Sequence, residues 1–520
     1  MHGAIAAGHP LTAAAGARAL EAGGNAVDAC LAAAFVSWVA ESPLTGPGGG
    51  GFMLVHTARD ETTRLLDFFV AVPGLGLDAA GRRGTMDEVD VQFAPGGATQ
   101  VFHIGPASNA VPGAVAGLAA AHRAHATRPW AELIEPTIGL ARDGVQLTAP
   151  QAYLHAILDL ILRAREEGRK IYGPDGKRLV TGDRVVMSDL ARTLEVLAEE
   201  GAPALYGGRL GHALVEHVRA GGGTITLEDL RAYRVIRRRP VSVRFDGQEF
   251  LSNPPPSSGG VLIGYGLKLL DRLPPRPPGS AAALAELVEI MREQARARAG
   301  SFASELYRGG LARRLCAEQS VRAALDRIGS ALGVPESAPP SGTTHISVVD
   351  RVGNAASLTI STGSGSGVVV PGTGIGLNNM LGEFDLNVSG RAAAAGRRLT
   401  SMMSPSIVMG ADGPRLVVGS AGSLRLRGAV MQVVINVVRH GMSVEDAIAF
   451  PRVHVDDEHV HIEGGADAAE VDKLALQGYD LVRWRRRNLF FGGAAAVELR
   501  RGGELHAAGD SRRGGYGVVV

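Results

Sequence analysis

The sequence predicts a mixed α/β protein in which two stacked sheets lie between two layers of helices, and three observations lead to this fold class. The chain of 520 residues is several times longer than a common domain, so it can bury a very large core. Its first part has mostly helical periodicity with a few strands, and the part after residue 341 has mostly the alternation of strands. Strands from both parts that share one core between helical layers form a four-layer αββα sandwich.

The first helices and strands are expected near the N-terminus. Residues 10–40 predict two packed helices, separated by Gly23-Gly24-Asn25, which interrupts the apolar stripe. The second helix is apolar nearly all round over residues 28–39, so we expect it in the core. A loop rich in glycine and proline follows, and residues 52–55 and 64–68 then predict two paired strands.

The rest of the first part is mostly helical. One exception is the alternating segment 241–251, where Asp246-Gly247 predicts a tight hairpin turn. The helices are expected at residues 113–126, 130–143, 153–167, 189–200, 227–233, 261–270 and 281–299.

Strands dominate the second part. Residues 335–341 are mostly small and polar with three prolines, so we expect an exposed segment directly before the change. Strands are expected at residues 345–350, 355–360, 407–409, 415–418, 454–455 and 494–499, with helices at 428–440 and 468–477.

Composition excludes several classes of partner. Lys+Arg 53 nearly cancels Asp+Glu 52, so neither a nucleic acid nor an anionic membrane surface is expected as a partner. Cys30 and Cys316 cannot form a disulfide framework, and no Cys/His zinc spacing occurs, so we expect neither metal nor cofactor. The N-terminus lacks the pattern of a signal peptide, and the longest apolar run, 29–40, is too short to cross a bilayer. The expectation is a cytoplasmic protein with a small-molecule substrate.

Thr343 is the residue with the most distinctive setting. It lies in Ser341-Gly342-Thr343-Thr344-His345, where a small glycine precedes two hydroxyl residues and an alternating strand follows. A chain cut before Thr343 would carry a nucleophile, the hydroxyl, and a base, the α-amine, on one residue. Taken by itself, the segment is more simply interpreted as a Gly-Thr turn that leads into a strand.

The chain resembles the γ-glutamyltransferase (γ-glutamyl transpeptidase) family of N-terminal-nucleophile hydrolases. The matching motifs occur in order along almost the whole chain, which gives the resemblance its specificity. They are residues 21–29 (EAGGNAVDA), 48–54 (GGGGFML), 111–113 (VPG), 140–144 (LARDG), 253–260 (NPPPSSGG), the Thr343 segment, 377–379 (LNN), 403–405 (MSP) and 449–452 (AFPR).

The resemblance implies a proenzyme that cleaves itself between Gly342 and Thr343. It predicts a large chain 1–342 and a small chain 343–520 that remain together as one intertwined domain, and it leaves open whether two such heterodimers pair. Thr343 would then attack an acyl carbonyl and form a covalent acyl-enzyme, with Ser361 beside the nucleophile. An alternative interpretation is that Ser361 is a turn residue in a Ser/Gly-rich segment. Backbone N–H groups of Gly422 and Ser423 are the implied oxyanion donors.

The positions that would read a glutamyl group depart from the family pattern. The family has an arginine after Leu-Asp-Phe, where this chain has Phe69, and this change removes a bidentate carboxylate clamp. Gly363 replaces a family asparagine. Met380 replaces a glutamine directly after Asn379, and Glu383 replaces an aspartate.

One more departure from the family pattern, and several residues with alternative roles, belong to the predicted substrate site. A family pair of serines is Ser401-Met402 here. The alignment can slip within residues 361–376, although the position of Phe69 does not depend on that segment. Glu383 and Arg398 are candidates for reading a substrate amine or carboxylate, or for structural ion pairs. His345 is expected to orient its strand rather than to act as a base.

Four functions follow from these residues. The favoured one is a self-processing threonine acyl hydrolase or acyltransferase that has lost glutamyl specificity. The alternatives are a C–C bond hydrolase that releases an oxalyl-type fragment, as the resemblance implies for relatives in antibiotic 4-alkylproline biosynthesis, an ordinary γ-glutamyl hydrolase, and an inactive scaffold.

Overall fold

Two antiparallel sheets form the centre of the molecule. The computed structural model describes residues 2–78, 81, 84–92, 99–328, 342–384, 393–422, 425–456 and 459–520. The first sheet has the order β22 (Tyr516–Val519), β1 (Gly3–Ala7), β11 (Thr344–Asp350), β12 (Ala355–Ser361), β2 (Gly50–Thr57), β3 (Thr62–Phe68) and β8 (Ile236–Arg238). The second has the order β21 (Leu505–Gly509), β20 (Gly493–Leu499), β16 (Gly413–Ala421), β15 (Ser406–Gly410), β10 (Gln248–Ser252) and β9 (Val241–Phe245).

Both sheets combine strands from before and after Gly342. β11 lies between β1, where Ile5 pairs with Val348, and β12, and β12 in turn pairs with β2. In the second sheet, β15 pairs with β10, so the two parts of the sequence also meet there. The predicted interleaving is therefore confirmed. A cut at Gly342 would leave two chains joined by complete hydrogen-bond ladders.

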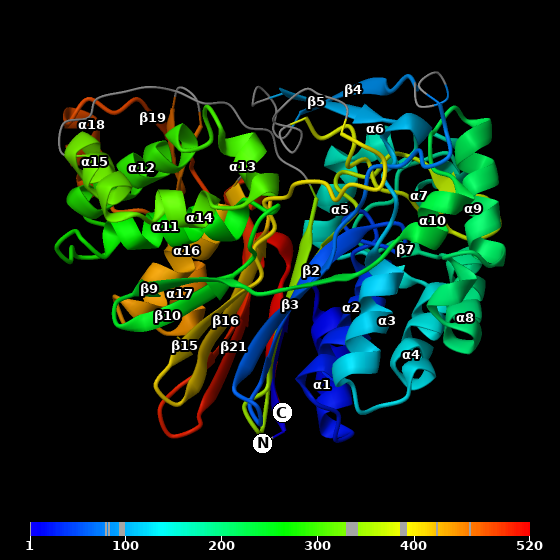
Figure 1. Ribbon diagram of the computed structural model, residues 1–520, viewed down its shortest axis with the longest axis horizontal. Helices are drawn as coiled ribbons and strands as arrows, with labels where there is room; N and C mark the ends of the chain where they lie inside the picture. Colours follow the sequence, from blue (N-terminus) through cyan, green and yellow to red (C-terminus); the bar gives the residue numbers. More distant parts are fainter. Residues whose placement is uncertain are drawn as a thin grey trace.

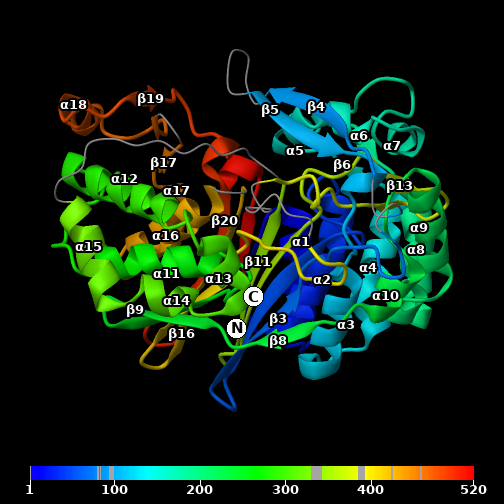
Figure 2. The same ribbon diagram turned by 45° about the horizontal axis from the view of Figure 1, so that its top comes forward.

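Helices cover the outer face of each sheet, which gives the predicted αββα layers (Figures 1 and 2). A third apolar cluster, which includes Phe52, Leu54 and Val417, fills the space between the sheets. The first sheet is covered by α1 (Pro10–Glu21), α2 (Ala26–Ala40) and α3 (Ala114–His125), with α4 (Trp130–Asp143) and α8 (Ser188–Glu200) packed outside them. The second is covered by α11 (Gly259–Leu270), α16 (Arg425–Val438) and α17 (Val444–Ala449), with α12 (Ala281–Arg296) beyond.

Helix α2 shows how sequence determines position in this fold. Every residue from Ala26 to Ala40 is buried, as its uniform apolar character predicts. Asn25 caps the helix in a capping box with Asp28. The helix ends at Ala40, and its C-cap residue, Glu41, begins the loop that leads to the candidate site.

Most predicted elements are confirmed, and α4 matches its predicted bounds at both ends. The predicted helix at 153–167 is wrong as a single element, because the chain bends twice there. A Cβ atom added at Gly168 would lie 2.1 Å from the Leu162 carbonyl oxygen, so the second bend depends on a glycine. The three helices are α5 (Ala149–Ile157), α6 (Asp159–Leu162) and α7 (Glu166–Tyr172).

The remaining elements lie at the periphery. The expected exposed segment 335–341 lies outside the described residues. None of the helices described is long and apolar enough to cross a membrane. The other helices are α9 (Arg209–Ala220), α10 (Leu227–Ala232), α13 (Phe302–Arg308), α14 (Leu311–Leu315), α15 (Glu318–Ile328) and α18 (Ala468–Leu476). The other strands are β4 (Asp87–Gln92), β5 (Thr99–Ile104), β6 (Val145–Gln146), β7 (Arg184–Val185), β13 (Val369–Val370), β14 (Ile375–Gly376), β17 (Val453–Val455), β18 (Val460–Ile462) and β19 (Leu481–Arg483).

Candidate active site

Thr343 lies immediately before the first residue of β11, at one end of the first sheet. Thr344 pairs with Ile360 of β12, and this register places Thr343 beside Ser361. The two hydroxyl oxygens are 3.4 Å apart. The Thr343 hydroxyl donates to the carbonyl oxygen of Gly342 at 2.8 Å, and Thr343 is only 4% exposed. The predicted nucleophile and the predicted scissile carbonyl are therefore in contact in a nearly closed site.

Ser361 contacts the same carbonyl group. Its hydroxyl donates to the Gly342 oxygen in a short hydrogen bond and accepts the backbone N–H of Gly363 at 2.8 Å. Two hydroxyl groups, those of Thr343 and Ser361, thus point at one carbonyl oxygen. Hydrogen bonds of this kind stabilise negative charge that develops on the oxygen during attack on the carbonyl carbon.

The turn after Ser361 brings two more predicted residues to the site. Gly363 has φ of +72°, and a Cβ atom added there would lie 2.2 Å from Oδ1 of Asn379 and 2.6 Å from Oε1 of Glu383. The missing side chain therefore allows both polar groups to approach the turn. Asn379 also accepts the backbone N–H of Ser364 at 3.0 Å, which holds the turn in place.

His345 is a buried structural histidine. Its ring nitrogens lie 2.8 Å from the hydroxyl of Thr359 and 2.9 Å from that of Ser347. Burial lowers the pKa of His345 to about 3, so the ring is neutral at ordinary pH. The expectation that it orients its strand is consistent with these contacts.

A buried carboxyl group that sequence reasoning missed holds the next residue of the strand. Glu41 accepts the hydroxyl of Thr344 at 2.5 Å and that of Thr12 at 2.8 Å. Burial raises the pKa of Glu41. No local signal identifies this contact, because Glu41 and Thr344 are far apart in sequence.

The predicted oxyanion turn is described in part. Gly422 directly follows β16, and the last residue of that strand, Ala421, lines a cavity together with Thr343. Ser423 lies outside the described residues. The structure therefore places one end of this turn near Thr343, and the assignment of its N–H groups stays a prediction.

Phe69 and Met380 lie in the apolar cluster between the two sheets. Phe69 is fully buried and stacks on Phe52, with 5.3 Å between the ring centroids. Met380 belongs to the same cluster and is 1% exposed. Where the family pattern would have an arginine, this chain therefore has a packed aromatic side chain.

Arg398 is a structural ion-pair residue. Its guanidinium lies 3.2 Å from a carboxylate oxygen of Asp67 and also donates to the backbone oxygens of Phe69 and Arg234. Asp67 pairs with Arg238 as well, at 2.8 Å. These contacts fix the end of β3, and they occupy the Arg398 guanidinium with partners inside the protein.

Ser401 and Met402 lie on a loop that packs against the start of α11. The Ser401 hydroxyl accepts the N–H of Met403 at 3.0 Å, and the Met402 sulfur lies 3.1 Å from the Ser258 hydroxyl. Met402 belongs to the apolar cluster under α11 and α16. The described hydrogen-bond partners of Ser401 and Met402 lie in this same loop or in the segment directly before α11.

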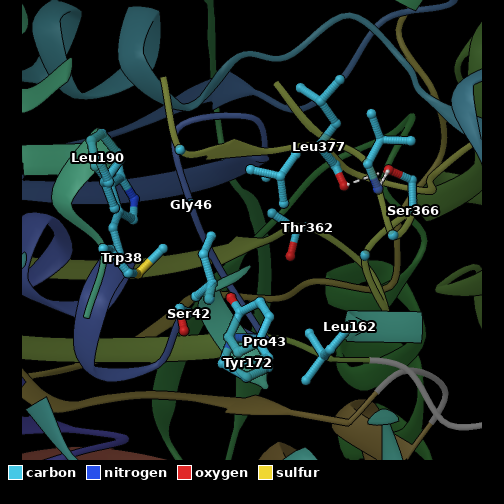
Figure 3. Close-up of a pocket in the computed structure, with 18 of the residues that line it drawn as sticks. Trp38, Ser42, Pro43, Gly46, Leu162, Tyr172, Leu190, Thr362, Ser366 and Leu377 are labelled. Carbon is cyan, nitrogen blue, oxygen red and sulfur yellow. Dashed lines mark hydrogen bonds between the residues drawn. The ribbon is translucent and has the colours of Figure 1, made fainter. Parts of the chain in front are cut away.

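Two cavities adjoin the site. One is lined by Thr362, which follows Ser361, and by Trp38, Tyr172 and Leu377 (Figure 3). The other is lined by Thr343 itself, with Glu41 and Arg513. In the part of the chain that the structure describes, no group of three or more His, Cys, Asp or Glu side chains is placed to hold a metal ion.

These layers define the fold of an N-terminal-nucleophile hydrolase. The crystal structure of cephalosporin acylase from Bacillus halodurans has the same fold, with a TM-score of 0.86 and 24% identity over 99% of this chain and 95% of that one. The chain belongs to the gamma-glutamyltranspeptidase family, whose model matches residues 12–520. It is 34% identical to the Acylase ACY 1 proenzyme of Pseudomonas sp. (strain SE83) over 100% of this chain and 93% of that protein. It is 30% identical to the glutathione hydrolase proenzyme of Escherichia coli (strain K12) over 95% and 87%. The protein is therefore an enzyme of the hydrolase and acylase type.

Proposed function

We propose that the protein is a self-processing amide acylase whose nucleophile is the N-terminal Thr343 of a small chain, 343–520, held to a large chain, 1–342. The observation that carries this proposal is the pair of hydroxyl groups on one carbonyl: Thr343 and Ser361 both donate to the Gly342 oxygen. Two relatives that match nearly the whole chain are named proenzymes, which supports processing.

Processing begins with attack of Thr343 Oγ on the carbonyl carbon of Gly342, as the hydroxyl proton is lost to solvent. The Ser361 hydroxyl stabilises the resulting oxyanion. The C–N bond between Gly342 and Thr343 then breaks, and the nitrogen takes up a proton. This step leaves an ester between Gly342 and the threonine oxygen. Water hydrolyses the ester, which gives a Gly342 carboxylate and a free Thr343 amine.

Turnover of substrate uses the same nucleophile, Thr343 Oγ, but the base is now the free α-amine. The free α-amine of Thr343 removes the proton of its own hydroxyl, directly or through water, and Oγ attacks the amide carbonyl of the substrate. Collapse of the tetrahedral intermediate breaks the C–N bond, and the leaving amine takes the proton. Water, or another amine, then releases the acyl group from the threonine ester.

The acyl group is proposed to lack the glutamyl α-carboxylate. Phe69 and Met380 are packed apolar residues, and Arg398 already pairs with Asp67, so none of these three positions offers a free guanidinium to a carboxylate. A phenyl ring provides neither charge nor donors. The name of the Acylase ACY 1 proenzyme supports the acylase class of the reaction.

Purified protein tests the proposal with two chromogenic amides, butyryl-4-nitroanilide and γ-glutamyl-4-nitroanilide. We expect release of 4-nitroaniline from the butyryl compound, with a kcat/KM at least about tenfold higher than for the glutamyl compound, because a buried substrate charge without a partner costs about 1–3 kcal/mol or more. A preference for the glutamyl compound would contradict the loss of glutamyl specificity. Mass spectrometry of the products distinguishes amide cleavage from C–C cleavage.

A further inference from the structure

Arg513 brings a positive charge into the cavity that Thr343 lines. It ends the short helix η4 (Ser511–Arg513), which follows β21. The cavity runs along the start of β11, where Thr343 and the next two residues, up to His345, line it. A Cβ atom added at Gly493 would lie 2.4 Å from Cδ of Arg513, so this glycine leaves the space that the arginine side chain occupies.

The carboxylates around helix η4 are already paired with other arginines. Asp510 lies 2.7 Å from Arg452 and 3.1 Å from Arg512. Arg512 also forms a short ion pair with Glu463. These two carboxylates therefore face two guanidinium groups at close range, and Arg513 is a third cation beside them.

Arg513 itself has no close counter-ion. Among the described residues, no carboxylate oxygen lies within 4.0 Å of its guanidinium, and its buried Nε has no hydrogen-bond partner. Glu41 contributes a longer-range attraction, and its two oxygens accept the hydroxyls of Thr12 and Thr344. Burial lowers the pKa of Arg513 to about 10, so the guanidinium is still charged at neutral pH.

The other titratable groups near Thr343 are neutral, paired or opposite in sign. Burial lowers the pKa of His345 to about 3, and burial raises the pKa of Glu41, so both favour their neutral forms. Glu383 adjoins the turn after Ser361, 2.6 Å from a Cβ atom added at Gly363, and a negative charge there acts against that of Arg513. Two more groups complete the set: Asp510, which is paired, and His9, whose pKa burial lowers to about 4.

A cation in this cavity matters because processing creates a titratable group at Thr343. In the uncut chain the Thr343 nitrogen is an amide and does not titrate, whereas a free α-amine has a pKa of about 7.7–8.0 in peptides and is mostly protonated at neutral pH. A protonated amine cannot accept the hydroxyl proton. A positive charge nearby disfavours the protonated form.

We propose that Arg513 keeps the α-amine of processed Thr343 neutral, and therefore available as the base, by charge repulsion and without contact with the substrate. This inference rests on the proposed function, because only cleavage before Thr343 frees the amine. During turnover the amine takes the proton of the Thr343 hydroxyl and becomes an ammonium group. Repulsion from Arg513 then favours the transfer of this proton to the leaving amine.

Carbamoylation of the processed protein with cyanate tests the amine without any substrate, because cyanate reacts with the neutral amine. The tryptic peptide of residues 343–351 (TTHISVVDR) reports the extent of reaction by mass spectrometry. Its rate from about pH 5.5 to about pH 9 should give an amine pKa below about 7 in the wild type and about one unit higher in Arg513→Gln. Arg513→Lys, which keeps the charge, should stay close to the wild type.

Arg439→Gln is the matched control for the loss of a buried arginine. The Arg439 side chain is 8% exposed, lies 3.5 Å from Asp271, and lines a different cavity, near α12 and α16. Its replacement should leave the pKa of the Thr343 amine unchanged.

The pH profile of butyryl-4-nitroanilide turnover gives the second readout. In Arg513→Gln, the acidic limb of kcat/KM should move about one unit to higher pH, so the loss is about tenfold near pH 6 and small near pH 9. A loss by the same factor at every pH would assign Arg513 to oxyanion or substrate binding and would overturn the inference.

The two readouts separate this inference from the proposed function. Equal amine pKa values in the wild type and Arg513→Gln would overturn the inference and leave the acylase function standing. An amine whose pKa depends on Arg513, in a protein that releases no aniline, would support the inference and show that the acylase function is wrong. If Arg513→Gln does not fold, the wild type decides, because an amine pKa of about 8 or above would overturn the inference.

Discussion

The surroundings of Thr343 and those of Phe69 differ in the kind of interaction that holds them. Around Thr343, two hydroxyl groups donate to the Gly342 carbonyl oxygen and the Gly363 N–H donates to the Ser361 hydroxyl, and each of these bonds is directional. Around Phe69, aromatic and aliphatic side chains fill the space between two sheets. Reaction chemistry depends on positions accurate to tenths of an ångström, whereas an apolar wall tolerates substitutions of similar volume. The difference explains how bond-cleaving groups can persist while the groups that read a substrate change.

The largest expected effect comes from removing the nucleophile. Thr343→Ala should give one uncut chain, and turnover should fall by roughly 10⁴-fold or more, because both proposed reactions use the same oxygen. Denaturing electrophoresis and release of 4-nitroaniline measure the two outcomes. Efficient processing in this variant would show that the hydroxyl cluster is not the reaction centre.

The second substitution tests the other hydroxyl on the Gly342 oxygen. Ser361→Ala should slow processing by roughly 10²- to 10³-fold, which is the usual cost of losing one oxyanion donor. The half-time of conversion from one band to two measures the effect. Ser361→Thr restores a hydroxyl and should process at close to the wild-type rate, and an unchanged rate in Ser361→Ala would assign Ser361 a purely structural role.

A third substitution tests whether Phe69 belongs to the core. Phe69→Ala should lower the free energy of unfolding by about 3–5 kcal/mol, because the side chain is fully buried and stacks on Phe52. Thermal unfolding of Thr343→Ala and of the double variant Thr343→Ala/Phe69→Ala measures this without interference from processing. Phe384→Ala is the matched control: Phe384 is 57% exposed, and its loss should cost less than about 1 kcal/mol. An equal loss in the free energy of unfolding for the two substitutions would show that Phe69 is not part of the core.

The smallest effect concerns pH. The pKa of His345 falls from 6.5 in the unfolded chain to about 3 in the fold, so the unfolded state binds an extra proton between these values. Stability should therefore decrease as the pH falls below about 6.5, and this histidine accounts for about 2 kcal/mol of the loss at pH 5. Denaturant unfolding at pH 7 and pH 5 should show a smaller loss for His345→Gln than for the wild type, although His9 and His155, whose pKa values also fall to about 4, contribute in both proteins. An identical loss in both proteins would contradict the assigned pKa.

Sequence reasoning predicted the features that depend on neighbouring residues. The bounds of α4, the burial of α2 and the turn at Asp246-Gly247, where both residues have positive φ, all follow from local patterns. The strand β1 was not predicted, because Gly3–Ala7 consists of glycine, alanine and one isoleucine, without an alternating polar face. The single helix expected at 153–167 failed because apolar periodicity does not report a bend that a glycine permits.

The site could be predicted only in so far as its residues lie within recognisable motifs. Thr343 and Ser361 are separated by a single hairpin, and β11 and β12 bring them together. Glu41 and Arg513 reach the same cavity from opposite ends of the chain, and no spacing in the sequence indicates this. Phe69 was identified as a departure at a substrate position, but its stacking between the sheets depends on the packing of both layers.

N-terminal sequencing of the purified, active protein under denaturing conditions tests the self-cleavage claim most directly. The account predicts two chains, one of which begins Thr343-Thr344-His345. A single uncut chain in a preparation that turns over its substrate, or a small chain that begins at any other residue, would contradict it.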